Sequence, residues 1–203
     1  MAKTKNIAIY GISANPITVG HTMVAQVVYS QCLNIDEVWI SPCYSHQFGK
    51  DLAPADIRGE MVMKAVLSIH KGVEGWLGEI TDKFTGKTWE FINAIKGKMS
   101  NHNFHIVVGY DNAVSLAKKW DHGEELIQTV PFIVVNRAVK DIQASPEDSW
   151  WLKPPHQYVD LQWQTSSTIV RDAIKAKNYK LAERHVHPLV WDMIKKHNLY
   201  GYE

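Results

Sequence analysis

Short apolar runs of strand length alternate along this chain with longer segments of helical periodicity. Such an order predicts crossover units, in which each strand leads through a helix to a parallel neighbour in the same sheet. The runs at 104–108 and 131–135 are apolar almost throughout, which is typical of strands buried on both faces. We expect strands at 5–10, 38–41, 76–80, 104–108, 131–135 and 158–161.

The segments between these strands carry apolar side chains at helical spacing, as in the stripe from Ile57 through Met61 to Ala65. The stretch 140–156 is rich in Pro, Ser, Trp and charge, and we interpret it as an irregular connection. Two or three short helices are expected after it. The order as a whole predicts an α/β fold of the Rossmann-like, doubly wound type, with a mostly parallel sheet and a small C-terminal helical region from about 165 to 203.

Composition limits the classes of partner. The 203 residues include 22 Lys and Arg against 21 Asp and Glu, so the net charge is +1 and no general field attracts nucleic acid or an anionic membrane. No apolar run approaches the ~18 residues of a membrane span, and the first residues are too weakly apolar for a signal peptide. The 2 cysteines do not support a disulfide framework. We therefore expect a single cytoplasmic domain over 1–203, without nucleic-acid or membrane partners; a homo-oligomer is left open.

The loop after the first expected strand carries groups suited to an anion. Gly11 ends the strand and lets backbone approach a ligand, while Gly20 stands just before a helix, where free N–H groups and the helix dipole favour negative charge. Thr18 and His21 add a hydroxyl and an imidazole three residues apart. Open α/β sheets bind ligands at this edge. The alternative is that Thr18 is a turn residue and His21 bonds only to backbone at the helix start.

A second group of polar side chains begins an expected helix near the C-terminus. Ser166, Ser167 and Thr168 can cap that helix, and Arg171 lies one turn further on, on the same side as the cap. Capping explains the hydroxyl groups without a ligand. A phosphate chain bound at the helix N-terminus would also give the arginine a partner.

These two motifs resemble the signatures of the nucleotidyltransferase superfamily. The first, NPITVGH, is similar to T/HxGH, and the second, TSSTIVR, is similar to [IV]SSTxxR with Thr165 in place of the aliphatic residue. Between them the sequence resembles the nicotinamide or nicotinate mononucleotide adenylyltransferases over nearly its whole length. This resemblance implies an enzyme that transfers AMP from ATP to the pyridine mononucleotide and forms NAD, or deamido-NAD, and pyrophosphate.

The resemblance also implies roles for individual residues. The residues that it implies for catalysis are Thr18, His21 and Arg171. Those implied for ATP are Gly11, Ile12, Gly20, Gly109, Asp111, Ser166, Ser167 and Thr168. Those implied for the acceptor are Lys50, Arg58, Thr88, Trp89, Trp120 and Arg137, with Trp120 against the pyridine ring. The expected cofactor is Mg²⁺ held by phosphate oxygens, because the sequence offers no cage of carboxylates.

Several alternatives stay open at this stage. Another member of the superfamily, such as a pantetheine-phosphate adenylyltransferase or a cytidylyltransferase, shares the two motifs. A silent nucleotide-binding module shares the fold, although it has no physical need of Thr18, His21 and Arg171 together. Surface charge would equally explain the presence of Lys50 and Arg58. Trp89 could contact the ring of the acceptor or simply belong to the core. The sequence does not say whether the acceptor carries an amide or an acid.

Overall fold

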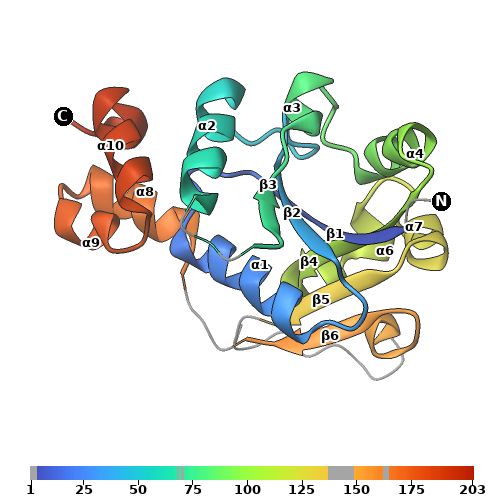
Figure 1. Cartoon of the computed structure of the whole chain (residues 1–203). Helices are drawn as coiled ribbons and strands as arrows, with labels where there is room; N and C mark the ends of the chain where they lie inside the picture. The colour runs from blue at the N-terminus through green and yellow to red at the C-terminus, as the bar shows by residue number, and fades with distance from the viewer. Residues whose placement is uncertain (1–3, 68, 70, 137–148, 162–164) are drawn as a thin grey trace.

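The computed structural model describes residues 4–67, 69, 71–136, 149–161 and 165–203. Within this part the strands form one six-stranded sheet in the order β3-β2-β1-β4-β5-β6, and every neighbouring pair is parallel (Figure 1). The doubly wound α/β fold is thereby confirmed. The strands are β1 (Lys5–Ile12), β2 (Glu37–Pro42), β3 (Val73–Gly75), β4 (His102–Gly109), β5 (Phe132–Asn136) and β6 (Gln157–Asp160).

Helices cover both faces of this sheet, and three more form the C-terminal group at one end of the molecule (Figure 1). The longer crossover helices are α1 (Val19–Gln31), α2 (Ala55–Val66) and α4 (Thr88–Lys98). The short ones are α3 (Gly78–Thr81), α5 (Tyr110–Ala113), α6 (Leu116–Lys119), α7 (Gly123–Thr129) and the 3₁₀ turn η2 (Trp150–Leu152). The C-terminal group is α8 (Ser167–Lys175), α9 (Tyr179–Glu183), α10 (Pro188–Lys196) and the 3₁₀ turn η3 (Leu199–Gly201).

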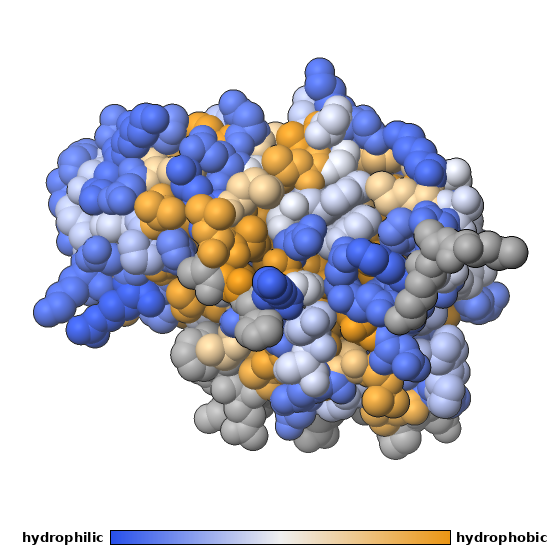
Figure 2. Space-filling view, viewed as in Figure 1, coloured by the Kyte–Doolittle hydropathy of each residue, from blue (hydrophilic) through white to orange (hydrophobic). Residues whose placement is uncertain are grey.

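The apolar run in β1 is continuous because both faces of this strand are buried. Ala8 and Tyr10 point into a core shared with α1, α2, α8 and α10, whereas Ile7 and Ile9 point into a second core shared with α4 to α7. Alternate residues of a strand face opposite sides, so a strand buried on both faces has no polar position. On the face in Figure 2, apolar surface gathers where α2 meets the C-terminal helices. No helix in the described ranges is long and apolar enough to cross a membrane.

The expected third strand at 76–80 is wrong. The strand is Val73–Gly75, which pairs with β2, and Gly78–Thr81 forms α3 instead. The chain leaves the sheet at Trp76, whose indole stacks on Trp39 with ring centroids 5.4 Å apart. The apolar run that suggested a strand therefore packs against the sheet instead of extending it. The other five strands and the C-terminal helices are confirmed, while 140–148 lie outside the described residues.

The strand order places a topological switch at the centre of the sheet. From β1 the chain winds outward through β2 to β3, and it then crosses back to β4 on the other side of β1. The loops that follow β1 and β4 leave in opposite directions, which opens a crevice at the carboxyl ends of these two strands. Gly11 and Gly109 lie at this crevice.

A buried arginine on α2 holds the loops beside the crevice. The Arg58 side chain is fully buried, and its guanidinium donates to four carbonyl oxygens. Its Nε reaches Ala53 at 2.8 Å, its Nη1 reaches Ser13 at 2.8 Å and Cys43 at 2.7 Å, and its Nη2 reaches Tyr44 at 2.9 Å. Because buried carbonyl groups need donors, this one side chain joins the loop after β1 to the loop after β2.

Replacing Arg58 by Met should lower the free energy of unfolding by about 3 kcal/mol or more, because several buried carbonyl oxygens lose their donors together. Lysine keeps the charge and part of the donors, so Arg58→Lys should lose less. Arg184→Met, at an exposed position, is the matched control and should change stability by less than about 0.5 kcal/mol. Urea unfolding measures all three. An Arg58→Met protein as stable as the control would show that the loops do not depend on this side chain.

Candidate active site

A cavity of about 590 Å³ opens at the carboxyl ends of β1 and β4. Its walls come from the loop after β1, the loop after β2, the segment around the start of α4, the residues after β4 and the N-terminus of α8. The site residues expected from the sequence that line it are Gly11, Ile12, His21, Lys50, Thr88, Gly109, Asp111, Trp120, Ser166, Ser167, Thr168 and Arg171. Segments separated by up to about 160 positions in the sequence thus share one cavity.

His21 is oriented by the residue that begins its helix. Its Nδ1 accepts a hydrogen bond from the backbone N–H of Thr18 at 3.1 Å and lies 2.8 Å from the Thr18 hydroxyl oxygen. A backbone N–H can only donate, so Nδ1 is unprotonated and the ring proton is on Nε2. The imidazole lines the cavity, whereas Thr18 is only 2% exposed and does not. Thr18 therefore acts on the cavity through His21, which offers an N–H donor from Nε2.

Arg171 connects the two motifs. Its Nη1 donates to the backbone carbonyl of Asn15 at 2.7 Å, and its Nη2 lies 3.1 Å from the Thr168 hydroxyl. Ser166 caps α8 by accepting from the backbone N–H of Ile169 at 3.3 Å. The guanidinium is held beside the N-terminus of a nine-residue helix and faces the cavity. Positive charge and free backbone N–H groups thus converge on one wall.

The first loop is also tied to its neighbours through Asn15. The Asn15 amide donates to the carbonyl of Asp51 at 3.3 Å, and its side-chain oxygen accepts from the backbone N–H of Ala53 at 3.0 Å. From the other side, the Ser167 hydroxyl donates to the carbonyl of Pro16 at 2.8 Å. Elements that are far apart in the sequence therefore fix the shape of the cavity wall.

The structure does not bring every expected residue to the cavity. Gly20 is buried at the start of α1 and does not line it. Arg58 is fully buried, donates to four backbone carbonyl oxygens behind the wall and does not line the cavity. Trp89 stacks on His122, with ring centroids 5.0 Å apart, and does not line the cavity. Arg137 lies outside the described residues.

Several lining residues in the loop after β2 were not among the residues expected from the sequence. Ser45, His46, Gln47 and Phe48 line the cavity, and burial together with the charge of Lys50 lowers the pKa of His46. The available signal was position, because this loop follows a strand of the same parallel sheet. Gly86 packs closely against the same loop.

At Gly86 the backbone has φ of +86°, and an added Cβ would lie 2.4 Å from the carbonyl oxygen of Ser45. Only glycine allows both this conformation and this approach. The segment that leads to Thr88 is therefore seated directly on the loop after β2, which closes that part of the cavity wall.

Glu79 also lines the cavity and was not among the expected site residues. It is 6% exposed, and its Oε1 accepts a hydrogen bond from the Ser41 hydroxyl at 2.7 Å. Burial raises the pKa of Glu79 to about 7, an effect that the Ser41 hydrogen bond and the charge of Arg58 partly offset. Within the described residues, no three His, Cys, Asp or Glu side chains gather where they could hold a metal ion.

The raised pKa of Glu79 makes stability depend on pH. The folded protein keeps this proton up to a pH of about 7, whereas the unfolded chain releases it near the ordinary value of 4.5, so stability falls as pH rises between them. From pH 5 to pH 8, wild type should lose roughly 2 to 3 kcal/mol more than Glu79→Gln. Urea unfolding at both pH values measures this, with Glu60→Gln on the exposed side of α2 as control. Equal losses in wild type and Glu79→Gln would contradict the assignment.

Comparison with known proteins adds independent findings. A family model described as cytidylyltransferase-like matches residues 9–173. A protein of Anaeromyxobacter sp. (strain K), named "Probable nicotinate-nucleotide adenylyltransferase", is 34% identical over 136 residues, which cover 64% of this chain and 71% of the relative. A protein of Oceanobacillus iheyensis with the same name is 28% identical over 203 residues, which cover 98% of both chains.

A solved structure shares the complete fold. The nicotinic acid mononucleotide adenylyltransferase of Plasmodium falciparum, in complex with NaAD, aligns over 98% of both chains with a TM-score of 0.79 and 25% identity. The same enzyme in complex with APC aligns with a TM-score of 0.78. The sheet order, the two motifs at one cavity and these similarities agree. This chain belongs to the cytidylyltransferase-like family and, within it, to the nicotinate-nucleotide adenylyltransferases.

Proposed function

We propose that this chain transfers AMP from ATP to nicotinate mononucleotide, with release of deamido-NAD and pyrophosphate. One observation carries the proposal: a single cavity joins His21 and Arg171, which suit a triphosphate, to Thr88 and Trp120, which suit a pyridine nucleotide. The names of the relatives favour this reaction over the pantetheine-phosphate and cytidylyl alternatives, and they favour the acid over the amide acceptor.

The reaction needs alignment more than it needs proton transfer. An oxygen of the acceptor phosphate attacks the α-phosphorus of ATP, and the bond from that phosphorus to the bridging oxygen of pyrophosphate breaks. The attacking group is already an anion at neutral pH, so no general base is required. The protein must hold two anions that repel each other and stabilise the charge that develops on the phosphate oxygens.

The positions of the polar groups suggest how this charge is met. His21 donates from Nε2 to an oxygen of the reacting phosphate, because its Nδ1 is occupied by Thr18. Arg171 and the free N–H groups of α8 bind the phosphates that leave as pyrophosphate. A donor that is fixed before the reaction begins costs no reorganisation as the charge develops.

The proposed cofactor is Mg²⁺ that arrives with the nucleotide. This fits the residues present, because the described part of the chain holds no group of three metal-ligating side chains. When bound to the triphosphate, the ion neutralises charge on its oxygens. The side chains of the cavity then orient the substrates and stabilise the charge that develops as the reaction proceeds.

The remaining walls are assigned to the two nucleosides. Gly109 at the end of β4 and Asp111 in α5 receive the ribose of ATP, and Trp120 receives the pyridine ring. Lys50 lies on the loop after β2 and suits the acceptor phosphate. Because the reaction depends on ATP and both cysteines are free, we place it in the cytoplasm.

One incubation tests this function directly. Purified protein with ATP and Mg²⁺ receives nicotinate mononucleotide, nicotinamide mononucleotide or phosphopantetheine, and the products are separated by chromatography. We expect deamido-NAD and pyrophosphate as the main products, with less dinucleotide from the amide acceptor and none without a divalent ion. Adenylylated phosphopantetheine in the absence of any dinucleotide would contradict the proposal.

Replacing His21 by Ala should lower kcat by about 10²-fold, which is typical for the loss of one preorganised donor. The KM for ATP should change much less, since the contact strengthens only as charge develops in the transition state. Steady-state kinetics measures both constants. His197→Ala, at an exposed position outside the cavity, is the control. An unchanged kcat in His21→Ala would contradict the catalytic role and show that His21 serves only as a structural residue at the start of α1.

A further inference from the structure

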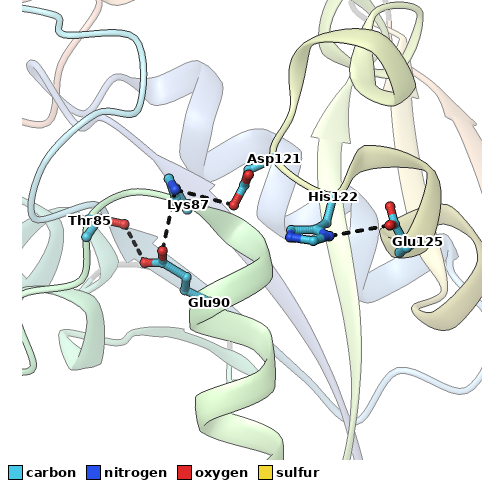
Figure 3. A network of polar contacts seen from close by, with 6 residues as sticks. All are labelled: Thr85, Lys87, Glu90, Asp121, His122 and Glu125. Atoms are coloured by element: carbon cyan, nitrogen blue, oxygen red, sulfur yellow. Dashed lines mark hydrogen bonds and ion pairs between the residues drawn. The ribbon is translucent and has the colours of Figure 1, made fainter.

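Two surface segments meet beside the acceptor end of the cavity. The first, 85–90, contains Thr88, and the second, 120–125, contains Trp120, and both of these side chains line the cavity. Thr88 begins α4, while Trp120 lies between α6 and α7. Lys87, which precedes Thr88, and Asp121, which follows Trp120, point toward one another across the gap between the segments (Figure 3).

Two contacts cross this gap among the described residues. The Lys87 ammonium lies 3.5 Å from a carboxylate oxygen of Asp121 (Figure 3). The Trp89 indole stacks on the His122 imidazole, with ring centroids 5.0 Å apart and planes inclined by 23°. Each contact joins an immediate neighbour of Thr88 to a residue one or two positions after Trp120. We call these four residues the clasp.

Further bonds hold each half of the clasp in place. Glu90 accepts from the Thr85 hydroxyl at 2.6 Å and lies 3.6 Å from the Lys87 ammonium. His122 has a left-handed backbone and lies 3.4 Å from a carboxylate oxygen of Glu125. Figure 3 shows these bonds on either side of the gap. Each half thus has polar contacts of its own, and the clasp joins the two halves at the surface, above the core on which Trp89 and Trp120 both pack.

The clasp is too exposed to serve mainly as a source of stability. The side chains of Lys87 and Asp121 are 43% and 38% exposed, and ion pairs at such positions add little to the free energy of unfolding. Its four residues are, however, the sequence neighbours of Thr88 and Trp120, which both line the cavity. Resting on the function proposed above, we propose that the clasp positions these two side chains and so sets the affinity for the pyridine mononucleotide.

Asp121 gives the sharpest test, because simple electrostatics and the clasp predict opposite results. The acceptor is an anion, so removing a negative charge near the cavity should on electrostatic grounds leave its KM unchanged or lower it. If the clasp positions Trp120, Asp121→Asn should instead raise the KM for nicotinate mononucleotide, by about threefold for a contact of this exposure. The KM for ATP and kcat should stay within about twofold.

His122→Asn tests the second contact. Asparagine tolerates the left-handed backbone, so this change removes the stacking ring with little strain. His122→Asn should raise the same KM by about threefold. The double variant that also carries Asp121→Asn should raise it by about tenfold, as expected from the size of an exposed ion pair and an aromatic pair. Thermal melting should show little change in any of these variants.

The chain offers a matched control. Asp82 pairs with Lys98 at the other end of α4 at 2.6 Å, and its side chain is 37% exposed, almost as much as that of Asp121. Asp82→Asn should leave every constant unchanged. A wild-type protein that forms no dinucleotide would refute the proposed function. Active wild type together with an unchanged or lowered acceptor KM in Asp121→Asn would refute the clasp alone.

Discussion

The buried guanidinium of Arg58 joins two loops: it binds the loop after β1 through the carbonyl of Ser13 and the loop after β2 through three further carbonyl oxygens. A buried loop carries carbonyl oxygens that secondary structure does not pair. Here one fully buried guanidinium binds four of them, from the loops after β1 and β2. From the opposite side, Arg171 binds the carbonyl of Asn15. Two arginines therefore bind carbonyl oxygens of the loop after β1, Arg58 at Ser13 and Arg171 at Asn15, and this loop forms one wall of the cavity.

The two arginines differ in what they leave for a ligand. Arg58 has no exposed surface and binds carbonyl oxygens, so its charge acts on the cavity only at a distance, with Glu79 as a buried acid beside it. Arg171 borders the cavity and lies at the N-terminus of α8. With a net charge of only +1, the chain has no general attraction for anions, and the local grouping of Arg171, His21 and helix N–H groups supplies it instead.

Much of this arrangement could be predicted because its signals are local. The alternation of strands and helices along the chain follows from apolar periodicity, and the cap of α8 with Arg171 one turn on follows from seven consecutive residues. The buried position of Arg58 could not be predicted, because its partners are backbone oxygens of two loops. A basic residue on an amphipathic helix is normally expected to face solvent or to bind a ligand. The place of Trp89 could not be chosen between the acceptor site and the core for a similar reason: its partner, His122, is distant in the sequence. Glu79 was not predicted as a lining residue, because the segment 76–80 was interpreted as a strand whereas Glu79 lies in α3.

The central claim is that one cavity receives both substrates, with their reacting phosphates between His21 and Arg171 and the pyridine ring at Trp120. A crystal structure of this chain with deamido-NAD tests it most directly. The account predicts the adenosine ribose beside Gly109 and Asp111, the bridging phosphates within hydrogen-bond distance of His21 Nε2, and the pyridine ring stacked on Trp120. A dinucleotide bound outside this cavity, or bound in it with the pyridine ring beside Gly109, would contradict the account.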